Sequence, residues 1–301
     1  MININDLIMA SNSNTKDERE LIRDRKVEET YKQYPELEKI DKEIVAARTA
    51  GFIAVLDGNE VEERHNESLL RQLKEKRERC LGRYDIPSDF DEEKIICTRC
   101  NDTGFFKNKN GLRQVCPCRN DDLEECYRIS GMRDYSSIRT DNYSDDYFGN
   151  KDHRKILRRK MLDLVLGNED LSAKPLWVLF DGTQTGKTFL SVYVLKLAIN
   201  LGKSVYYTKL DEFMMMDRDT IDDIRDVDLL VVDDYVANMT MTGMTGTRLN
   251  ALLESRQAMG LATVIVTSFP IQNLIEESDS RISGKIQRAG IIKHDKGSDR
   301  K

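Results

Sequence analysis

Hydrophobic and polar positions follow two different periods along the chain. In residues 1–82, apolar residues such as Leu37 and Ile40 recur every three or four positions among many charged ones, which is the spacing of one face of an α-helix. Gly51 and the triplet Asp57-Gly58-Asn59 interrupt this pattern and indicate turns. We therefore predict a helical hairpin or a three-helix assembly. Its apolar stripe is thin, so either the helices pack only on each other or, as we favour, a partner protein completes the core.

The period changes from residue 151 onward, where short apolar runs alternate with helical patterns. Four runs are typical of buried strands: PLWVLF within 174–181, KSVYYT at 203–208, DLLVV at 228–232 and LATVIVTS at 261–268. A helix is expected over 188–201, between the first two runs. Strands that alternate with helices form parallel sheets with helices on both faces. The predicted fold class of this part is therefore α/β.

Composition and charge exclude several classes of protein. The 301 residues suffice for about two domains, and 33% of them are charged and 39% hydrophobic, which favours a globular protein with long solvated helices. A formal net charge of -6 is not typical of a protein that coats nucleic acid through bulk positive charge. No apolar run approaches the ~20 residues that span a bilayer, and the first residues lack the features of a signal peptide. We therefore expect a soluble, cytoplasmic protein that does not bind membranes.

The cysteines are clustered. Four of the six form a C-x2-C pair and a C-x-C pair, and these are the predicted metal ligands: Cys97, Cys100, Cys116 and Cys118. Clustered cysteines in a cytoplasmic protein more often bind metal than form disulfides. Four thiolates suit tetrahedral Zn²⁺ and leave no open position, so the site would be structural. Turn residues between the two pairs predict a ribbon-like hairpin. Cys80 and Cys126 are interpreted as spare thiols, with Cys126 as an alternative ligand.

The segment DGTQTGKTFL, after the first predicted strand, is typical of a phosphate-binding loop. Such a loop leads into a helix whose N-terminal N–H groups face phosphate oxygens. Lys187 would bind the β- and γ-phosphates of ATP, and Thr188 would offer its hydroxyl to Mg²⁺. The usual pattern has its first glycine at position 181, where this chain has Asp181, whose carboxylate must point away from the phosphates or be neutralised. The loop residues expected to contribute are Gly182, Thr183, Gln184, Thr185 and Gly186.

A second motif, DLLVVDD at 228–234, follows about 45 residues later. In a buried strand that ends in two carboxylates, Asp233 would hold Mg²⁺ and Asp234 would polarise the attacking water. Asp is shorter than the Glu of many related sites, which favours slow hydrolysis. Each motif alone is also compatible with an ordinary strand or turn. Together, with a strand between them, they predict a Mg-ATP site.

The succession of these motifs resembles that of AAA+ ATPases, and more narrowly that of the DnaC/DnaI-type bacterial and phage helicase loaders and the related IstB transposition ATPases. The resemblance covers about residues 130–301 and is carried by FDGTQTGKTFL, DLLVVDDY, LNALLESRQAMGLATVIVTS, SRISGKIQR and GSDRK. The cysteine arrangement resembles the N-terminal part of DnaI-like loaders and is missing from ordinary IstB proteins. It therefore favours a loader.

The resemblance implies further roles. Sensor 1 falls to Ser268 or Thr267, because the Asn that commonly follows this strand in the family is Phe here; we favour Ser268. Arg281 matches the arginine finger, which acts on ATP bound by a neighbouring subunit, and Arg300 matches the sensor 2 arginine. Arg256 lies at a position that is often basic in the family, without an assigned task.

The function implied is that of a slow, partner-regulated ATPase in DNA replication. It would bind a DnaB-type hexameric helicase through its N-terminal region, place it on single-stranded DNA during primosome assembly, and self-associate through AAA+ domains. The alternatives are an IstB-like transposition regulator and a helicase adaptor whose P-loop does not hydrolyse ATP. The predicted division is a helical region at 1–82, a zinc-binding module at 83–126, a linker at 127–150 and an AAA+ domain at 151–301.

Overall fold

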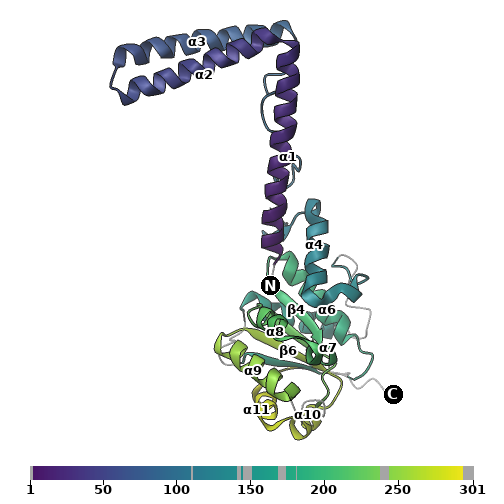
Figure 1. Ribbon diagram of the computed structural model, residues 1–301. Coiled ribbons are helices and arrows are strands. Elements are labelled where there is room, and N and C mark those ends of the chain that lie inside the picture. Colours follow the sequence, from purple (N-terminus) through teal and green to yellow (C-terminus); the bar gives the residue numbers. More distant parts are fainter. Residues whose placement is uncertain are drawn as a thin grey trace. The chain divides into compact units, whose positions relative to one another are not determined.

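The computed structural model describes residues 3–109, 111–140, 144, 151–168, 174–180, 182–237 and 244–293. The chain divides into two compact units. One unit is Asn12–Asp102, and the other combines Met1–Ser11 with Thr103–Lys301. Helix α1 (Ile4–Gln33) contributes residues to both (Figure 1).

The Asn12–Asp102 unit is built on an antiparallel pair of helices, α2 (Pro35–Leu56) and α3 (Glu60–Arg83) (Figure 1). A proline in the first turn starts α2, because its fixed φ suits that position and its missing N–H is not needed there. The side chain of Asn59 caps α3 by accepting a hydrogen bond from the N–H of Glu62 at 3.3 Å. The predicted helical hairpin, with its turn at 57–59, is confirmed.

The turn predicted at Gly51 is wrong, because α2 continues through this residue. A single glycine costs a helix interior only about 1 kcal/mol. The glycine also serves helix packing, since a Cβ added at Gly51 would lie 3.4 Å from the Cβ of Asn66 in α3.

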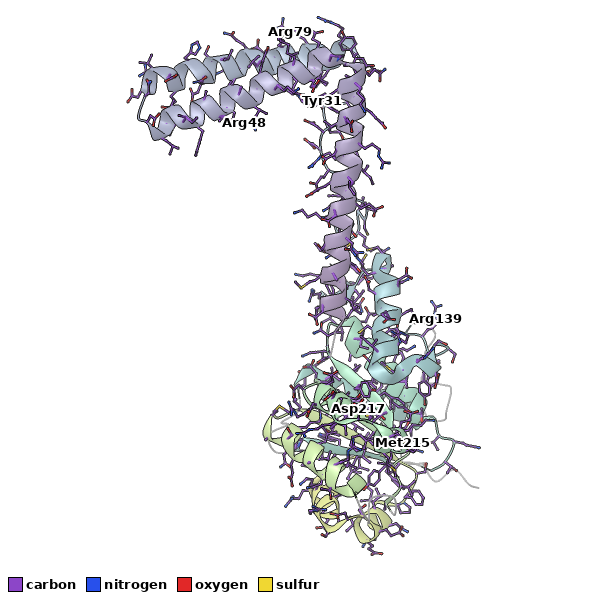
Figure 2. All side chains as sticks on the ribbon, in the orientation of Figure 1. Tyr31, Arg48, Arg79, Arg139, Met215 and Asp217 are labelled. Atoms are coloured by element: carbon purple, nitrogen blue, oxygen red, sulfur yellow. The ribbon has the colours of Figure 1, made fainter. Side chains whose placement is uncertain are left out.

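A small apolar core joins α2, α3 and the segment that follows them. Tyr31 of α1, labelled in Figure 2, packs against this core and donates a hydrogen bond from its hydroxyl to Asp41 at 2.9 Å. Arg77 Nε binds the other oxygen of Asp41 at 2.7 Å. The core residues are Leu37, Ile40, Ile44, Ala47, Leu73, Cys80, Leu81 and Phe90.

The second unit begins, after its short N-terminal piece, with a two-stranded ribbon. Strands β1 (Phe105–Lys107) and β2 (Arg113–Val115) pair antiparallel, as the sequence predicted. Two short helices follow, η1 (Pro117–Arg119) and α4 (Asn120–Tyr127). The next residues, part of the segment predicted as a linker, form the π-helical turn η2 (Arg128–Met132) and the 3₁₀ turn η3 (Arg133–Tyr135).

The centre of this unit is a five-stranded parallel sheet. Its strands in spatial order are β4 (Val205–Lys209), β5 (Leu229–Asp233), β6 (Ala262–Thr267), β3 (Leu176–Phe180) and β7 (Gly290–Lys293). The four predicted strands and the α/β fold class are confirmed, and β7 is an additional strand. Because all strands are parallel, the carboxyl ends of β3, β6 and β5 lie side by side at one edge of the sheet.

Helices cover both faces of the sheet. The helices are α5 (Lys151–Leu166), α6 (Lys187–Asn200), α7 (Leu210–Met215), α8 (Arg218–Arg225), α9 (Met244–Ala258), α10 (Ile271–Glu277) and α11 (Ser280–Arg288). Alternate residues of each strand point to opposite faces, so Leu179 joins the core under α5 and α6, whereas Val178 joins the core under α9 and α11. This double burial explains why the strands are continuous apolar runs. Within the described residues, no helix combines the length and apolar character that crossing a membrane requires.

Candidate nucleotide-binding site

The loop between β3 and α6 contains two residues in the left-handed backbone conformation. Gln184 and Gly186 adopt left-handed φ values of 58° and 78°, and Gly186 directly precedes the first residue of α6. The left-handed conformation favours glycine at that position. The N-terminal N–H groups of α6 have no partner within the helix and are therefore suited to bind an anion. Asp181, which replaces the usual first glycine, lies outside the described residues.

Lys187, the first residue of α6, folds back over its own loop. Its Nζ donates hydrogen bonds to the carbonyl oxygen of Gly182 at 2.5 Å and to the hydroxyl of Thr185 at 3.5 Å. The hydroxyl of Thr185 donates to the same carbonyl at 3.0 Å. A phosphate oxygen in the loop would replace this carbonyl as the partner of the ammonium group.

Thr188 and Asp233 meet across the carboxyl end of the sheet. The Thr188 hydroxyl donates to Asp233 Oδ2 at 2.7 Å, although the residues are far apart in the sequence. The other oxygen of Asp233 accepts the N–H of Asp234 at 2.7 Å. Asp233 is only 2% exposed, so its carboxylate is held in one orientation beside the hydroxyl.

Asp234 directly follows β5 and adopts a left-handed conformation, with φ 49°. This conformation is uncommon for residues other than glycine, although Asp is among the better suited. The side chain is exposed and borders the cavity described below. Partial desolvation of the carboxyl group, and then the negative charge of Asp233, raise the pKa of Asp234, while Lys209 and Lys187 oppose this effect. A higher pKa makes the carboxylate a better proton acceptor.

Thr267 and Ser268, the two candidates for the sensor position, have different surroundings at the end of β6. The hydroxyl of Thr267 donates to the carbonyl oxygen of Tyr235 at 2.9 Å and accepts the N–H of Phe269 at 3.1 Å, and the residue is buried. Thr267 therefore fixes the backbone around the site. Ser268 lies next to it in the cavity lining.

A cavity of about 570 Å³ brings most of these residues together. Gly182 contributes through its carbonyl oxygen to Lys187, and Ile138 is a lining residue that the sequence had placed in a linker. The lining residues are Ile138, Thr183, Gln184, Thr185, Gly186, Lys187, Thr188, Phe189, Asp233, Asp234, Thr267 and Ser268.

Of the two arginines expected from the family resemblance, only Arg281 lies within the described residues, and it is not among the residues that line this cavity. Arg281, at the start of α11, has a 49% exposed side chain and forms an ion pair with Asp279 at 3.0 Å. Arg300 lies outside the described residues.

Arg256 is fully buried, and it is not among the residues that line the cavity. Its guanidinium donates to Thr263 Oγ1 at 2.9 Å and to the carbonyl oxygens of Arg225 and Val227, both at 2.8 Å. It also donates to the carbonyl oxygens of Ile224 and Ala262. These partners lie where β5 and β6 begin, opposite the carboxyl ends that carry the site, so the residue ties the sheet to α8 and α9.

The four predicted metal ligands come together, because their sulfur atoms all lie within 4.8 Å of one another. In tetrahedral zinc with bonds of about 2.3 Å, sulfur atoms are about 3.8 Å apart, so a small contraction of this cluster would accommodate Zn²⁺. Cys126 is not a member of this group, and burial raises the pKa of its thiol to about 11. Cys80 lies in the helical core.

Tyr207 and Tyr135 are site residues that the sequence motifs missed. The hydroxyl of Tyr207 donates to Asp233 Oδ2 at 2.9 Å, and it lies 3.0 Å from the hydroxyl of Tyr135. The sequence offered only a weak indication of this role, because Tyr207 is simply a tyrosine near the end of the strand that precedes the DLLVVDD motif.

Comparison with known proteins gives fold similarities only. No protein-family model and no curated protein matches the sequence. Among solved structures, DnaI superposes with a TM-score of 0.42 at 19% identity over 55% of this chain and 92% of that chain. The DnaC helicase loader has a TM-score of 0.42 at 16% identity over 54% of this chain and 99% of that chain. AMPPCP-bound DnaA from Aquifex aeolicus has a TM-score of 0.42 at 16% identity over 52% of this chain, and the match spans 50% of that chain.

Proposed function

We propose that this protein is a Mg-ATP-dependent helicase loader of the DnaC/DnaI type. The observation that carries the nucleotide site is the hydrogen bond of 2.7 Å between Thr188 Oγ1 and Asp233 Oδ2. Adjacent oxygen ligands of octahedral Mg²⁺ lie about 2.9 Å apart when the metal–oxygen bonds are about 2.0–2.1 Å. The spacing of the two oxygens is therefore close to that of neighbouring ligands bound directly to one Mg²⁺. Lys187 and the N-terminus of α6 would bind the phosphates.

Hydrolysis in this proposal is slow and depends on assembly. Asp234 acts as the general base for water, and Ser268 contacts the γ-phosphate. Arg281 reaches the nucleotide of a neighbouring copy, as its exposure allows, after exchanging Asp279 for the phosphate oxygens. Without that neighbour, the charge that develops on the transferring phosphoryl group lacks a major stabilising partner.

The helical unit is the proposed contact with the replicative helicase. The loop end of the α2–α3 pair exposes large apolar side chains that the hairpin does not bury, and we call this set the hairpin tip. Its members and their exposed fractions are Phe52 65%, Ile53 51%, Val55 54%, Leu56 70% and Val61 78%. Exposed apolar clusters of this kind are typical of protein-binding surfaces. The apolar stripe that the sequence left incomplete would thus be completed by the partner.

The cysteine cluster is proposed to hold a structural Zn²⁺. Two of its members are buried and four thiolates fill the coordination sphere. The metal would order the ribbon β1–β2 and the chain around it, and it would take no part in the chemistry.

The test is native mass spectrometry of the protein mixed with a DnaB-type hexameric helicase in the presence of ATP or ADP. We expect a complex whose stoichiometry depends on the nucleotide, and loss of this dependence in Lys187→Ala. Lys203→Ala is the matched control, because Lys203 pairs with Asp228 at the opposite ends of the strands. Complex formation with a transposase instead of the helicase would favour the transposition regulator. If the stoichiometry of the helicase complex is the same with ATP and ADP, for the parent protein as well as for Lys187→Ala, the adaptor is favoured.

A further inference from the structure

The proposed Mg²⁺ carboxylate has a second hydroxyl partner outside the nucleotide motifs. Tyr207 on β4 donates to Asp233 Oδ2, the same oxygen that accepts from Thr188. Tyr207 and Asp233 are 1% and 2% exposed, so neither group exchanges this partner readily with water. Since Oδ1 is held by the N–H of Asp234, both oxygens of Asp233 have fixed donors and rotation of the carboxylate is restricted.

Tyr207 lies on the edge strand of the sheet, and the segment that follows the cysteine module covers it. The turn η2 packs on β4, and Gly131 makes the close approach possible. A Cβ at Gly131 would overlap the backbone carbonyl oxygen of Tyr207, and the residue also has a left-handed φ of 79°. Tyr135 follows at the end of η3, and its ring is in edge contact with that of Tyr207 at a centroid distance of 5.1 Å.

Tyr135 is itself fixed to neighbouring elements. The ammonium group of Lys196, on α6, donates to the carbonyl oxygen of Tyr135 at 2.9 Å. The same ammonium lies 4.6 Å from the ring centroid of Tyr127, the last residue of α4. A continuous set of contacts therefore links α4 and η3 to the carboxylate of Asp233.

The direction of the hydrogen bonds in this set follows from the number of protons. A phenol has one proton, and Tyr207 gives it to the carboxylate of Asp233. Tyr135 must therefore be the donor in the bond of 3.0 Å between the two hydroxyls.

We propose that Tyr207 is a positioning residue that orients Asp233 for Mg²⁺, and that Tyr135 holds Tyr207 in place. The segment between the cysteine module and the P-loop domain would thereby set the affinity of the site for Mg-nucleotide. This inference rests on the proposed nucleotide-binding function and adds two residues to it. Tyr207 and Tyr135 touch neither nucleotide nor metal, and they act through Asp233.

The test is a Mg²⁺ titration of fluorescent ATP-analogue binding by the full chain, with nucleotide affinity without Mg²⁺ as a second readout. We expect Tyr207→Phe to weaken the apparent Mg²⁺ affinity about 10-fold, because a hydrogen bond to a charged group is lost, and to leave metal-free binding unchanged. Tyr135→Phe should weaken it about 3-fold. The double variant should be no weaker than Tyr207→Phe, because Tyr135 acts only through Tyr207. Tyr206→Phe is the matched control on the same strand and should bind like the parent protein.

Two results separate failure of this inference from failure of the proposed function. If Lys187→Ala binds Mg-nucleotide as well as the parent protein, the nucleotide function itself fails. If Lys187→Ala loses binding while Tyr207→Phe and Tyr135→Phe keep the Mg²⁺ dependence of the parent protein, only the positioning role is overturned. Should Tyr207→Phe fold poorly, Tyr135→Phe alone decides, because its hydroxyl contributes to the same effect from a partly buried position.

Discussion

Arg256 illustrates, at the scale of single residues, how a basic side chain can act on the fold and not on the nucleotide. Its guanidinium is fully buried against four backbone carbonyl oxygens and one hydroxyl. Burial lowers the pKa of Arg256 to about 10, so it still carries its charge at neutral pH. The carbonyl dipoles take the place that a carboxylate would fill.

We expect Arg256→Ala to lower the free energy of unfolding by about 3–5 kcal/mol, because it leaves a cavity and several buried carbonyl oxygens without donors. Chemical denaturation measures this loss. Arg225→Ala is the control: it removes a half-buried arginine whose ion pairs with Asp222 and Asp226, two exposed residues, contribute little. Nucleotide affinity of folded Arg256→Ala should match that of the parent protein, and a selective loss of that affinity would contradict a purely structural role.

The residues that the sequence could identify are those whose spacing is local. Gly186, Lys187 and Thr188 follow one another at a loop-to-helix junction, and Asp233 ends an apolar run, so their chemistry is visible without a fold. Tyr207, Tyr135 and Arg256 depend on which strands become neighbours and on which segment covers an edge. No spacing in the sequence encodes those contacts.

At the scale of elements, burial decides which predictions hold. Four strands are mostly buried apolar runs of five or six residues and were therefore visible in the sequence, whereas β7 has only four residues, one of them the exposed Ile291, and was missed. Gly51 was expected to end a helix, yet helix packing against Asn66 favours a small residue within one. The hairpin tip shows the reverse case, since its apolar residues continue the helical pattern but remain exposed.

The hairpin tip therefore provides a prediction at this scale. Phe52→Asp combined with Leu56→Asp should weaken helicase binding at least 10-fold, because it places charges on the surface proposed to be buried by the partner. Helix content by circular dichroism should stay unchanged, since both side chains are exposed. Val45→Asp, an exposed apolar position earlier on α2, is the matched control and should bind normally. If the parent protein and the double variant bind the helicase with equal affinity, the hairpin tip is not the contact surface.

At the scale of the whole molecule, the candidate nucleotide site, the exposed apolar surface and the cysteine cluster lie in different regions of the chain. The proposed nucleotide site lies at the carboxyl ends of β3, β5 and β6. Ligands of parallel sheets commonly bind at this edge, where loops converge and helix N-termini point. The helical unit carries the apolar surface, and the cysteine module lies between them in the sequence. The segment after that module then reaches Asp233 through Tyr135 and Tyr207. If the cysteine cluster holds the proposed zinc, the metal could influence the proposed nucleotide site through this segment without entering its chemistry.

This arrangement predicts what loss of zinc would do. The parent protein should contain about one Zn²⁺ per chain by elemental analysis, whereas Cys97→Ser should contain little, because three thiolates hold the metal less tightly than four. Cys126→Ala is the control and should keep its zinc, since this buried thiol lies outside the cluster. If the ordered module supports Tyr135, Cys97→Ser should also weaken Mg-nucleotide binding by no more than Tyr135→Phe does. The double variant of Cys97→Ser and Tyr135→Phe should then bind Mg-nucleotide no more weakly than Tyr135→Phe alone. Additive losses of affinity would show that zinc affects the site independently of Tyr135.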